Sequence, residues 1–342
     1  MKPRILIIYT GGTIGMIENA QTGALEPFDF DHLIDCVPKV KMLDYEISHI
    51  QLTEPIDSSN MTPLHWGDIA GAVSENYNRY DGFVVLHGTD TMAYTASALS
   101  FMLENLSKPV IITGSQLPIG EVRTDGEENL ITALEIAACR TPGGDPQVQE
   151  VAILFENYLW RGNRAKKHSS TNFNAFKSYD YPELAHIGLS IDFNQDALLR
   201  LPFRRPLKVN RTMDVNVCFV DLFPGLSLDA IEYKLAQPGL KGIVLRTYGA
   251  GNAPTDEAFI NLMRRRIAEG LVVVNISQCD AGGVMPHRYA AGDALASAGV
   301  ISGGDMTGEA AITKLMHLFG LGLTPSEVSN LVGASLCGEI TV

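Results

Sequence analysis

Short, uninterrupted runs of Val, Ile and Leu constrain this chain most, because polar turns and segments of helical periodicity follow them along the sequence. Strands that helices bury on both faces read as continuous apolar runs, whereas half-exposed strands alternate. The clearest runs are Ile5–Tyr9, Phe83–His87, Val110–Thr113, Val151–Phe155, Val217–Asp221, Ile243–Thr247 and Leu271–Ile276. The pattern predicts an α/β fold with largely parallel sheets.

Amphipathic segments between these runs predict the helices that cover the sheets. They are Pro63–Arg79, Thr91–Leu106, Glu127–Arg140, Pro254–Ala268 and Thr307–Leu321. Within the stretch 192–215, two prolines and a basic cluster interrupt any strand or helix period. A chain of 342 residues also exceeds one comfortable core. We therefore expect a larger N-terminal domain, residues 1–191, with a mostly parallel sheet and helices on both faces. Residues 192–215 would be a linker and 216–342 a smaller C-terminal α/β domain.

Composition excludes several partners. The 26 basic and 39 acidic residues leave a net charge of −13, which repels phosphate backbones and predicts no nucleic-acid partner. No apolar run approaches the roughly 18 residues of a spanning helix, and the first run is too short for a signal peptide. The five cysteines form no Cys-x-x-Cys pair, and the histidines lack ligand spacing, so we expect no metal and no disulfide framework. These features predict a reduced, soluble, cytoplasmic protein with no membrane partner.

The turn after the first run carries the first candidate for chemistry, since ligands bind outside the carboxyl ends of parallel strands. Its sequence, Thr10 to Met16, is Thr-Gly-Gly-Thr-Ile-Gly-Met, which does not match Gly-x-Gly-x-x-Gly. No helical pattern follows at once, and a dinucleotide pyrophosphate needs that helix N-terminus. Two interpretations remain: a plain strand-ending turn, or the hydroxyl of Thr13 presented at the mouth of the sheet.

Three further segments carry polar side chains with two interpretations each. Thr89 and Asp90 follow the second run, where they would cap a helix or face the same crevice as Thr13. Lys167 lies in a charged loop, which is either a solvated surface loop or the source of a catalytic base. A lysine base requires burial or nearby cations that favour the neutral amine. The segment Asp57 to Asn60 precedes a helix. Its side chains either cap that helix or form a turn that binds a carboxylate. Together, two hydroxyls, a carboxylate and an amine indicate nucleophilic acyl transfer.

These segments resemble the bacterial-type L-asparaginases, and specifically their cytoplasmic, type I branch. Thr10–Met16 resembles the first signature of that family and His87–Thr91 resembles the second. Further matching segments are Asp57–Ser59 with Met61–Pro63, Thr113–Gln116, Arg161–Arg164 and Leu245–Gly249. The likeness extends from residue 10 to about residue 315, which is nearly the whole chain.

The resemblance implies hydrolysis of L-asparagine to L-aspartate and ammonia without a cofactor. Thr13 would be the nucleophile that attacks the side-chain amide carbon. Thr89, Asp90 and Lys167 would form a second catalytic group, in which Lys167 assists proton transfer through Thr89. The resemblance leaves open whether the reaction passes through an acyl-enzyme or through direct displacement by water, and whether asparagine or glutamine is preferred.

The resemblance also assigns substrate-binding residues. Asp90 would hold the substrate ammonium, while Asp57, Ser58 and Ser59 would hold its carboxylate end. Backbone N–H groups around Gly88 would stabilise the oxyanion. The family places each site between two subunits, so a homodimer or homotetramer is expected, with Tyr289 closing the site of the partner.

Two departures from the family pattern stand out. Many relatives place a tyrosine in the loop beside the nucleophile, whereas Ala24 follows Gly23 here, and Tyr289 is a candidate for the missing role. Arg246 and Cys279 match an activating asparagine site of some type I enzymes, but Lys166 replaces a smaller hydroxyl residue. An effector site at Arg246 and Cys279 is therefore a hypothesis.

Three other functions compete with this one. A non-catalytic amino-acid-binding module would share the fold but would not need Thr13, Thr89, Asp90 and Lys167 as a set. A dinucleotide-dependent dehydrogenase fails at the first glycine turn. A tRNA-dependent amidotransferase subunit resembles asparaginases but carries an additional N-terminal domain, whereas the first run here starts at Ile5, and the acidic charge also disfavours it.

Overall fold

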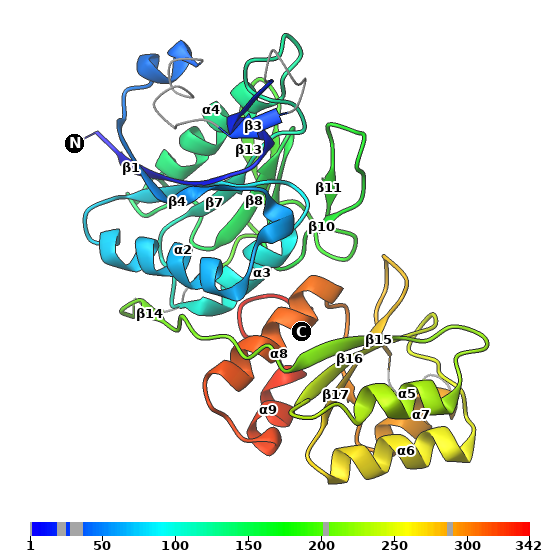
Figure 1. Cartoon of the computed structure of the whole chain (residues 1–342). Helices are drawn as coiled ribbons and strands as arrows, with labels where there is room; N and C mark the ends of the chain where they lie inside the picture. The colour runs from blue at the N-terminus through cyan, green and yellow to red at the C-terminus, as the bar shows by residue number, and fades with distance from the viewer. Residues whose placement is uncertain (1, 19–24, 28–36, 201–204, 286–289) are drawn as a thin grey trace. The chain divides into compact units, whose positions relative to one another are not determined.

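The computed structural model contains two compact units, Met1–Arg211 and Thr212–Val342 (Figure 1). It describes residues 2–18, 25–27, 37–200, 205–285 and 290–342. Over these residues, no helix combines the length and the apolar character that crossing a membrane requires.

Within the described part of the first unit, eight strands form one mixed sheet in the order β13-β12-β9-β8-β7-β5-β1-β4. Neighbours from β4 to β8 are parallel, and the pairs β8–β9, β9–β12 and β12–β13 are antiparallel. The strands are β1 (Arg4–Gly11), β4 (Glu46–Ile56), β5 (Gly82–Leu86), β7 (Val110–Thr113), β8 (Val151–Phe155), β9 (Tyr158–Arg161), β12 (Ala185–Ile187) and β13 (Ile191–Phe193). Shorter pairs are β2 (Met16–Glu18) with β3 (Leu25–Pro27), and β10 (Lys166–Lys167) with β11 (Phe176–Lys177).

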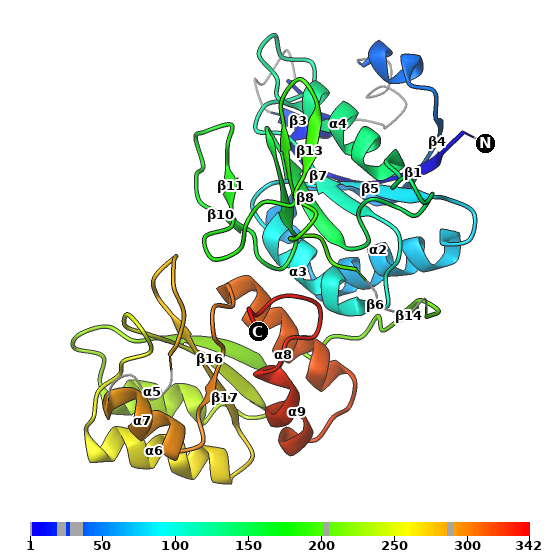
Figure 2. The ribbon, with the colours of Figure 1, turned by 180° about the vertical axis from the view of Figure 1, so that it is seen from behind.

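Helices cover both faces of this sheet, which explains the continuous apolar runs. Helix α4 (Gly126–Ala138) lies on one face, and α2 (Pro63–Asn76) and α3 (Met92–Met102) lie on the other, as Figures 1 and 2 show. Alternate residues of the central strands β5, β7 and β8 therefore enter different cores, and all of them are buried. Ile7 packs in the cluster that contains Leu134 of α4, and the adjacent Ile8 is equally inaccessible to solvent.

The second unit repeats this layering on a smaller scale. Its parallel sheet has the order β15 (Val217–Asp221), β16 (Gly242–Thr247), β17 (Val272–Ser277) and β18 (Ile301–Ser302). Figure 1 shows α5 (Leu228–Leu235), α6 (Glu257–Ala268) and α7 (Ala290–Ser297) on one face. Helices α8 (Gly308–Gly320) and α9 (Pro325–Val332) lie on the other. The predicted two-domain α/β architecture is confirmed.

The segment 192–215, which the sequence predicts as a linker, contains residues that pair with the first unit. Strand β13 ends at Phe193, and β14 (Lys208–Val209) pairs with β6 (Leu103–Glu104) after α3. Backbone groups in this segment therefore find strand partners, and the boundary between the compact units follows Arg211.

Strand order creates a topological switch point at β1. The chain passes from β1 to β4 on one side of it and then to β5 on the other. Such a reversal opens a crevice at the carboxyl ends of the strands, where ligands bind in open α/β sheets. The segments that leave β1, β4 and β5 therefore start at this crevice, and they carry Thr13, Ser58 and Thr89.

A buried ion pair anchors β9, just before the loop that carries Lys167. Arg161 Nε donates to Glu150 Oε2 at 2.7 Å, and both side chains are only 4% exposed. The guanidinium also donates to the Ala197 carbonyl at 2.7 Å and lies 4.2 Å from the ring centroid of Tyr181. Leu199 N donates to the second Glu150 oxygen at 2.7 Å. Each charge is thus satisfied where solvent is excluded.

Breaking this pair from one side should be costly. Arg161→Met leaves the Glu150 carboxylate buried without its ion-pair partner, and should lower the free energy of unfolding of the first unit by about 3–5 kcal/mol. Both tryptophans, Trp66 and Trp160, belong to that unit, so urea unfolding followed by their fluorescence reports it.

The matched control is Lys208→Met, which removes an exposed pair with Glu104 at 2.9 Å and should cost less than about 1 kcal/mol. Adding Glu150→Gln to Arg161→Met should recover part of the loss, because no unpaired charge then remains. Equal losses for Arg161→Met and Lys208→Met would contradict the anchoring role.

Candidate active site

The backbone of the turn after β1 closely approaches the backbone of the turn after β5. Gly11 and Gly12 have φ values of +115° and +89°, which side chains of L-residues rarely adopt. A Cβ atom on Gly12 would lie 2.4 Å from the Gly88 nitrogen, so only glycine fits. Gly12 N also donates to the Ile56 carbonyl at 3.2 Å. The ends of β1, β4 and β5 are therefore locked together, and Thr13 follows directly at the start of η1 (Thr13–Gly15), partly exposed.

The segment after β4 is held against the same turn. A Cβ atom on Gly88 would lie 2.6 Å from Ser58 Oγ, and Thr91 Oγ1 donates to the Ser58 carbonyl at 2.7 Å. Asp57 caps the short helix η3 (Ser58–Asn60), because its Oδ1 accepts from Ser59 N at 2.8 Å. Ser58 is buried, whereas Asp57 and Ser59 are exposed.

Lys167 reaches this turn from the β10–β11 hairpin. Its Nζ donates to Thr89 Oγ1 at 2.8 Å and to Asp90 Oδ1 at 2.7 Å. The Lys167 side chain is 17% exposed and that of Asp90 is 66% exposed, while Thr89 is buried. The structure thus places an amine, a hydroxyl and a carboxylate in one hydrogen-bonded group, although 78 residues separate Lys167 from Thr89.

His87 supports the same turn from inside. Its Nδ1 lies 2.6 Å from the Gly88 carbonyl, which can only accept, so this nitrogen carries the proton. Nε2 then accepts from Thr95 Oγ1 at 2.8 Å, and Thr95 accepts from Trp66 Nε1 at 2.9 Å. Complete burial lowers the pKa of His87 to about 4, although the Gly88 hydrogen bond opposes this shift. The imidazole is therefore a neutral structural support.

The expected effector residues lie in the second unit. Arg246 is at the carboxyl end of β16, 3.0 Å from Asp221 Oδ1, and its guanidinium carbon is 5.9 Å from the Phe219 ring centroid. Cys279 is exposed two residues after the adjacent strand β17. Tyr289, Gly23 and Ala24 lie outside the described residues.

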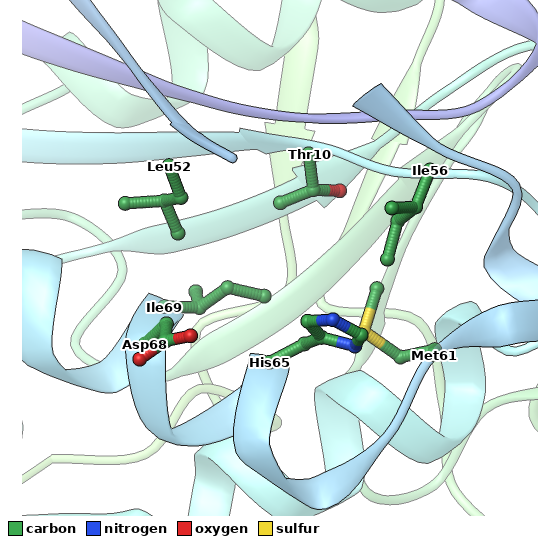
Figure 3. A pocket seen from close by; sticks show the side chains of 7 residues that line it. All are labelled: Thr10, Leu52, Ile56, Met61, His65, Asp68 and Ile69. Carbon is green, nitrogen blue, oxygen red and sulfur yellow. The ribbon is translucent and has the colours of Figure 1, made fainter. Parts of the chain in front are cut away.

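Two pockets of the described region contain none of the predicted site residues. Figure 3 shows one between β1, β4 and α2, lined by Thr10, Ile56 and Ile69 among others. Its volume of about 10 Å³ is at the limit for one water molecule and excludes an amino acid. The other, about 450 Å³, contains Glu128 and Glu156 near the β8–β9 turn, where burial and neighbouring carboxylates raise the pKa of Glu156.

Metal-ligating side chains do not gather in the described residues, which contain no group of three His, Cys, Asp or Glu arranged for an ion. The cysteines that the structure describes as free are Cys139, Cys218, Cys279 and Cys337.

Both units match known family models. The N-terminal asparaginase model matches residues 4–199, and the glutaminase/asparaginase C-terminal domain model matches residues 216–332. The chain belongs to the asparaginase family. This confirms the resemblance drawn from the sequence motifs.

Relatives of this asparaginase-family chain match it over almost its full length. L-asparaginase 1 of Escherichia coli (strain K12) is 42% identical over 347 residues, covering 99% of this chain and 98% of that protein. The crystal structure of L-asparaginase I from Vibrio cholerae O1 biovar eltor matches this structure with a TM-score of 0.91. The two chains are 39% identical, and the match covers both completely. A glutamyl-tRNA(Gln) amidotransferase subunit of Pyrococcus abyssi is 34% identical over 354 residues, covering 99% of this chain and 77% of that protein.

Sequence reasoning assigned no role to two residues of this asparaginase-family site. Thr89 Oγ1 donates to Gln116 Oε1 at 3.2 Å, and Gln116 Nε2 donates to the Asn172 carbonyl at 3.0 Å. The buried Asp125 carboxylate accepts from the backbone N–H groups of Gln116 and Leu117 at 2.9–3.1 Å. Burial raises the pKa of Asp125 against the pull of these hydrogen bonds. Gln116 belongs to the segment Thr113–Gln116 that resembles the family, whereas the signal for Asp125 was its position before a predicted helix.

The buried imidazole predicts a pH dependence of stability. Native His87 stays neutral down to about pH 4, whereas the unfolded chain binds this proton below about pH 6.5. The stabilisation is complete above pH 6.5 and is lost as the pH falls toward 4, by about 3 kcal/mol in all. NMR of the imidazole carbons should show no titration of His87 between pH 8 and 5, with free histidine as the internal control. A midpoint near 6.5 would contradict the burial argument.

Proposed function

We propose that this protein hydrolyses the side-chain amide of L-asparagine, giving L-aspartate and ammonia. In this reaction the C–N bond breaks, the oxygen of water joins the carbonyl carbon, and the nitrogen leaves as ammonia. The observation that carries the proposal is the hydrogen-bonded group of Lys167, Thr89 and Asp90 beside the Gly12–Gly88 contact. Membership of the asparaginase family supports the choice of amide, and the 42% identical L-asparaginase 1 supports the substrate.

The roles of the site residues follow from their chemistry. Thr13 attacks the amide carbon, and its hydroxyl proton passes to the departing nitrogen with Lys167 and the Thr89 hydroxyl as the relay. Water then releases aspartate and returns a proton to Thr13. Backbone N–H groups at Gly88 and Thr89 face the developing oxyanion, where one such donor contributes about 3 kcal/mol to transition-state stabilisation. No cofactor takes part in this scheme. Direct displacement by water, without attack by Thr13, has the same overall proton balance.

The ends of the substrate require opposite charges. Asp90 is 66% exposed and carries the negative charge that a substrate ammonium requires. Ser58 and Ser59 supply hydroxyl donors for the carboxylate. The Asp57 carboxylate repels a second carboxylate, so its contribution is to hold the Ser58–Ser59 turn through the Ser59 N–H.

We also propose the assembly and location that the family resemblance implies. The functional unit is a homodimer or homotetramer in which Tyr289 closes the partner's site, and Arg246 with Cys279 binds an asparagine effector. The Arg246 guanidinium, 34% exposed at a strand end, supports the effector site because it suits a carboxylate ligand. Free cysteines support a reducing, cytoplasmic location.

A second candidate is amide hydrolysis in the service of a tRNA-linked amidotransferase. The 34% identical amidotransferase chain of Pyrococcus abyssi favours it. Greater identity to an L-asparaginase, and a net charge of −13 that repels tRNA, favour the free amino acid.

The decisive experiment measures ammonia release from L-asparagine, L-glutamine and D-asparagine over a wide concentration range. We expect turnover of L-asparagine, and a sigmoidal rate curve if Arg246 and Cys279 bind an effector. One methylene is worth only about 1–3 kcal/mol of discrimination, so L-glutamine should be turned over roughly 10- to 200-fold less efficiently. Absence of ammonia release from L-asparagine would contradict the proposed function.

Thr13→Ala removes the attacking hydroxyl and little else. We expect kcat to fall by at least about a thousandfold, because other groups cannot replace a nucleophile. Calorimetric binding of L-asparagine and the thermal unfolding midpoint should stay close to those of the wild type. Thr10→Val is the matched control, since that hydroxyl donates to the Leu86 carbonyl behind the turn. Near-normal turnover by Thr13→Ala would reject Thr13 as the nucleophile.

A further inference from the structure

We propose that Gln116 is a positioning residue that orients the hydroxyl of Thr89 for proton transfer. The inference rests on the proposed function and assigns a role to a side chain outside the Thr13–Thr89–Asp90–Lys167 set.

The hydrogen bonds around Thr89 run in one direction. An ammonium group has three N–H donors and no acceptor, so protonated Lys167 donates to Thr89 Oγ1 and to Asp90 Oδ1. The single O–H proton of Thr89 must then go elsewhere, and Gln116 Oε1 accepts it at 3.2 Å. With this acceptor in place, a lone pair of the Thr89 oxygen faces Lys167.

The amide of Gln116 cannot easily turn over. Its Nε2 donates to the Asn172 carbonyl at 3.0 Å. A carbonyl can only accept, so the NH2 group must face Asn172 and Oε1 must face Thr89. Its backbone N–H and that of Leu117 are both held by the buried carboxylate of Asp125. Asn172 lies in the loop between β10 and β11, the hairpin that also carries Lys167. Gln116 therefore connects Thr89 to the element that presents its proton partner.

This arrangement predicts an effect on kcat rather than on substrate binding. During the transfer the Thr89 proton leaves Gln116 for the departing nitrogen, Lys167 gives a proton to the Thr89 oxygen, and the new O–H then donates to the neutral amine of Lys167. The Thr89 hydroxyl therefore turns between two acceptors, Gln116 before the transfer and Lys167 after it. Without Gln116, the hydroxyl has no second acceptor and the oxygen loses its fixed direction. Misdirected groups in a proton path commonly cost one or two orders of magnitude in rate.

The test is Gln116→Met, which keeps the length of the side chain and removes both hydrogen bonds. We expect kcat for L-asparagine to fall about tenfold, with KM within twofold of the wild type. Gln116→Asn, one methylene shorter and still polar, should lose a similar factor and guards against misfolding of the Met variant. Gln149→Met is the matched control, because its Nε2 also donates to a backbone carbonyl, that of Pro146, and kcat should not change.

Combination with Thr89 variants separates positioning from a general structural effect. In a Thr89→Val background, Gln116→Met should have no further effect on kcat, because groups that act as one unit are not additive. In a Thr89→Ser background its effect should exceed tenfold, because serine lacks the methyl group that restricts rotation of the threonine side chain.

Each outcome decides one question. Unchanged kinetics of both Gln116 variants, a raised KM with unchanged kcat, or an undiminished effect in Thr89→Val would overturn the positioning role. Failure of the wild type to release ammonia, or full activity of Thr89→Val, would instead overturn the proposed function on which the inference rests.

Discussion

The backbone contact between Gly12 and Gly88 is the constraint on which the site depends. A side chain at either position would collide with the other turn or with Ser58, so the ends of β1, β4 and β5 meet only because both residues lack a Cβ atom. Thr13 and Thr89 each follow one of these glycines. Two hydroxyls from distant parts of the chain thereby lie on facing turns at the topological switch point. The central strands that carry these turns are buried.

Polar groups of the site gain part of their order from buried supports behind them. The neutral His87 ring holds the Gly88 carbonyl, and the Asp125 carboxylate holds the backbone at Gln116. The Arg161–Glu150 pair anchors the strand that leads into the Lys167 loop. Each support finds hydrogen-bond partners in the absence of solvent, where an unpaired group would be costly. Groups that do not themselves move protons thus support the backbone around the Lys167–Thr89–Asp90 group.

How much of this could be read from the sequence depends on whether a feature is local. Runs such as Val151–Phe155 and Val217–Asp221 predicted their strands to the residue, because burial on both faces leaves a continuous apolar pattern. The sequence did not predict strand β4, because this strand lies at the edge of the sheet, is half exposed and contains Pro55, which only an edge strand tolerates. Gln116 meets Thr89 across 27 residues and Asn172 across 56, and no local pattern records such contacts. Motif resemblance pointed to Thr89, Asp90 and Lys167, while their mutual distances came only from the fold.

The unequal exposure of the two acceptors of Lys167 gives the proposed reaction its order. Asp90 is 66% exposed and open to an arriving ammonium, whereas Thr89 is buried. A substrate ammonium that pairs with Asp90 competes with Lys167 for the same carboxylate, in surroundings where solvent screens the exposed pair. The hydrogen bond to Thr89 has no such competitor and is retained as Lys167 loses part of its hold on Asp90. Pairing of the substrate ammonium with Asp90 therefore directs the lysine proton toward the Thr89 hydroxyl, and Gln116 keeps that hydroxyl oriented while the exchange takes place.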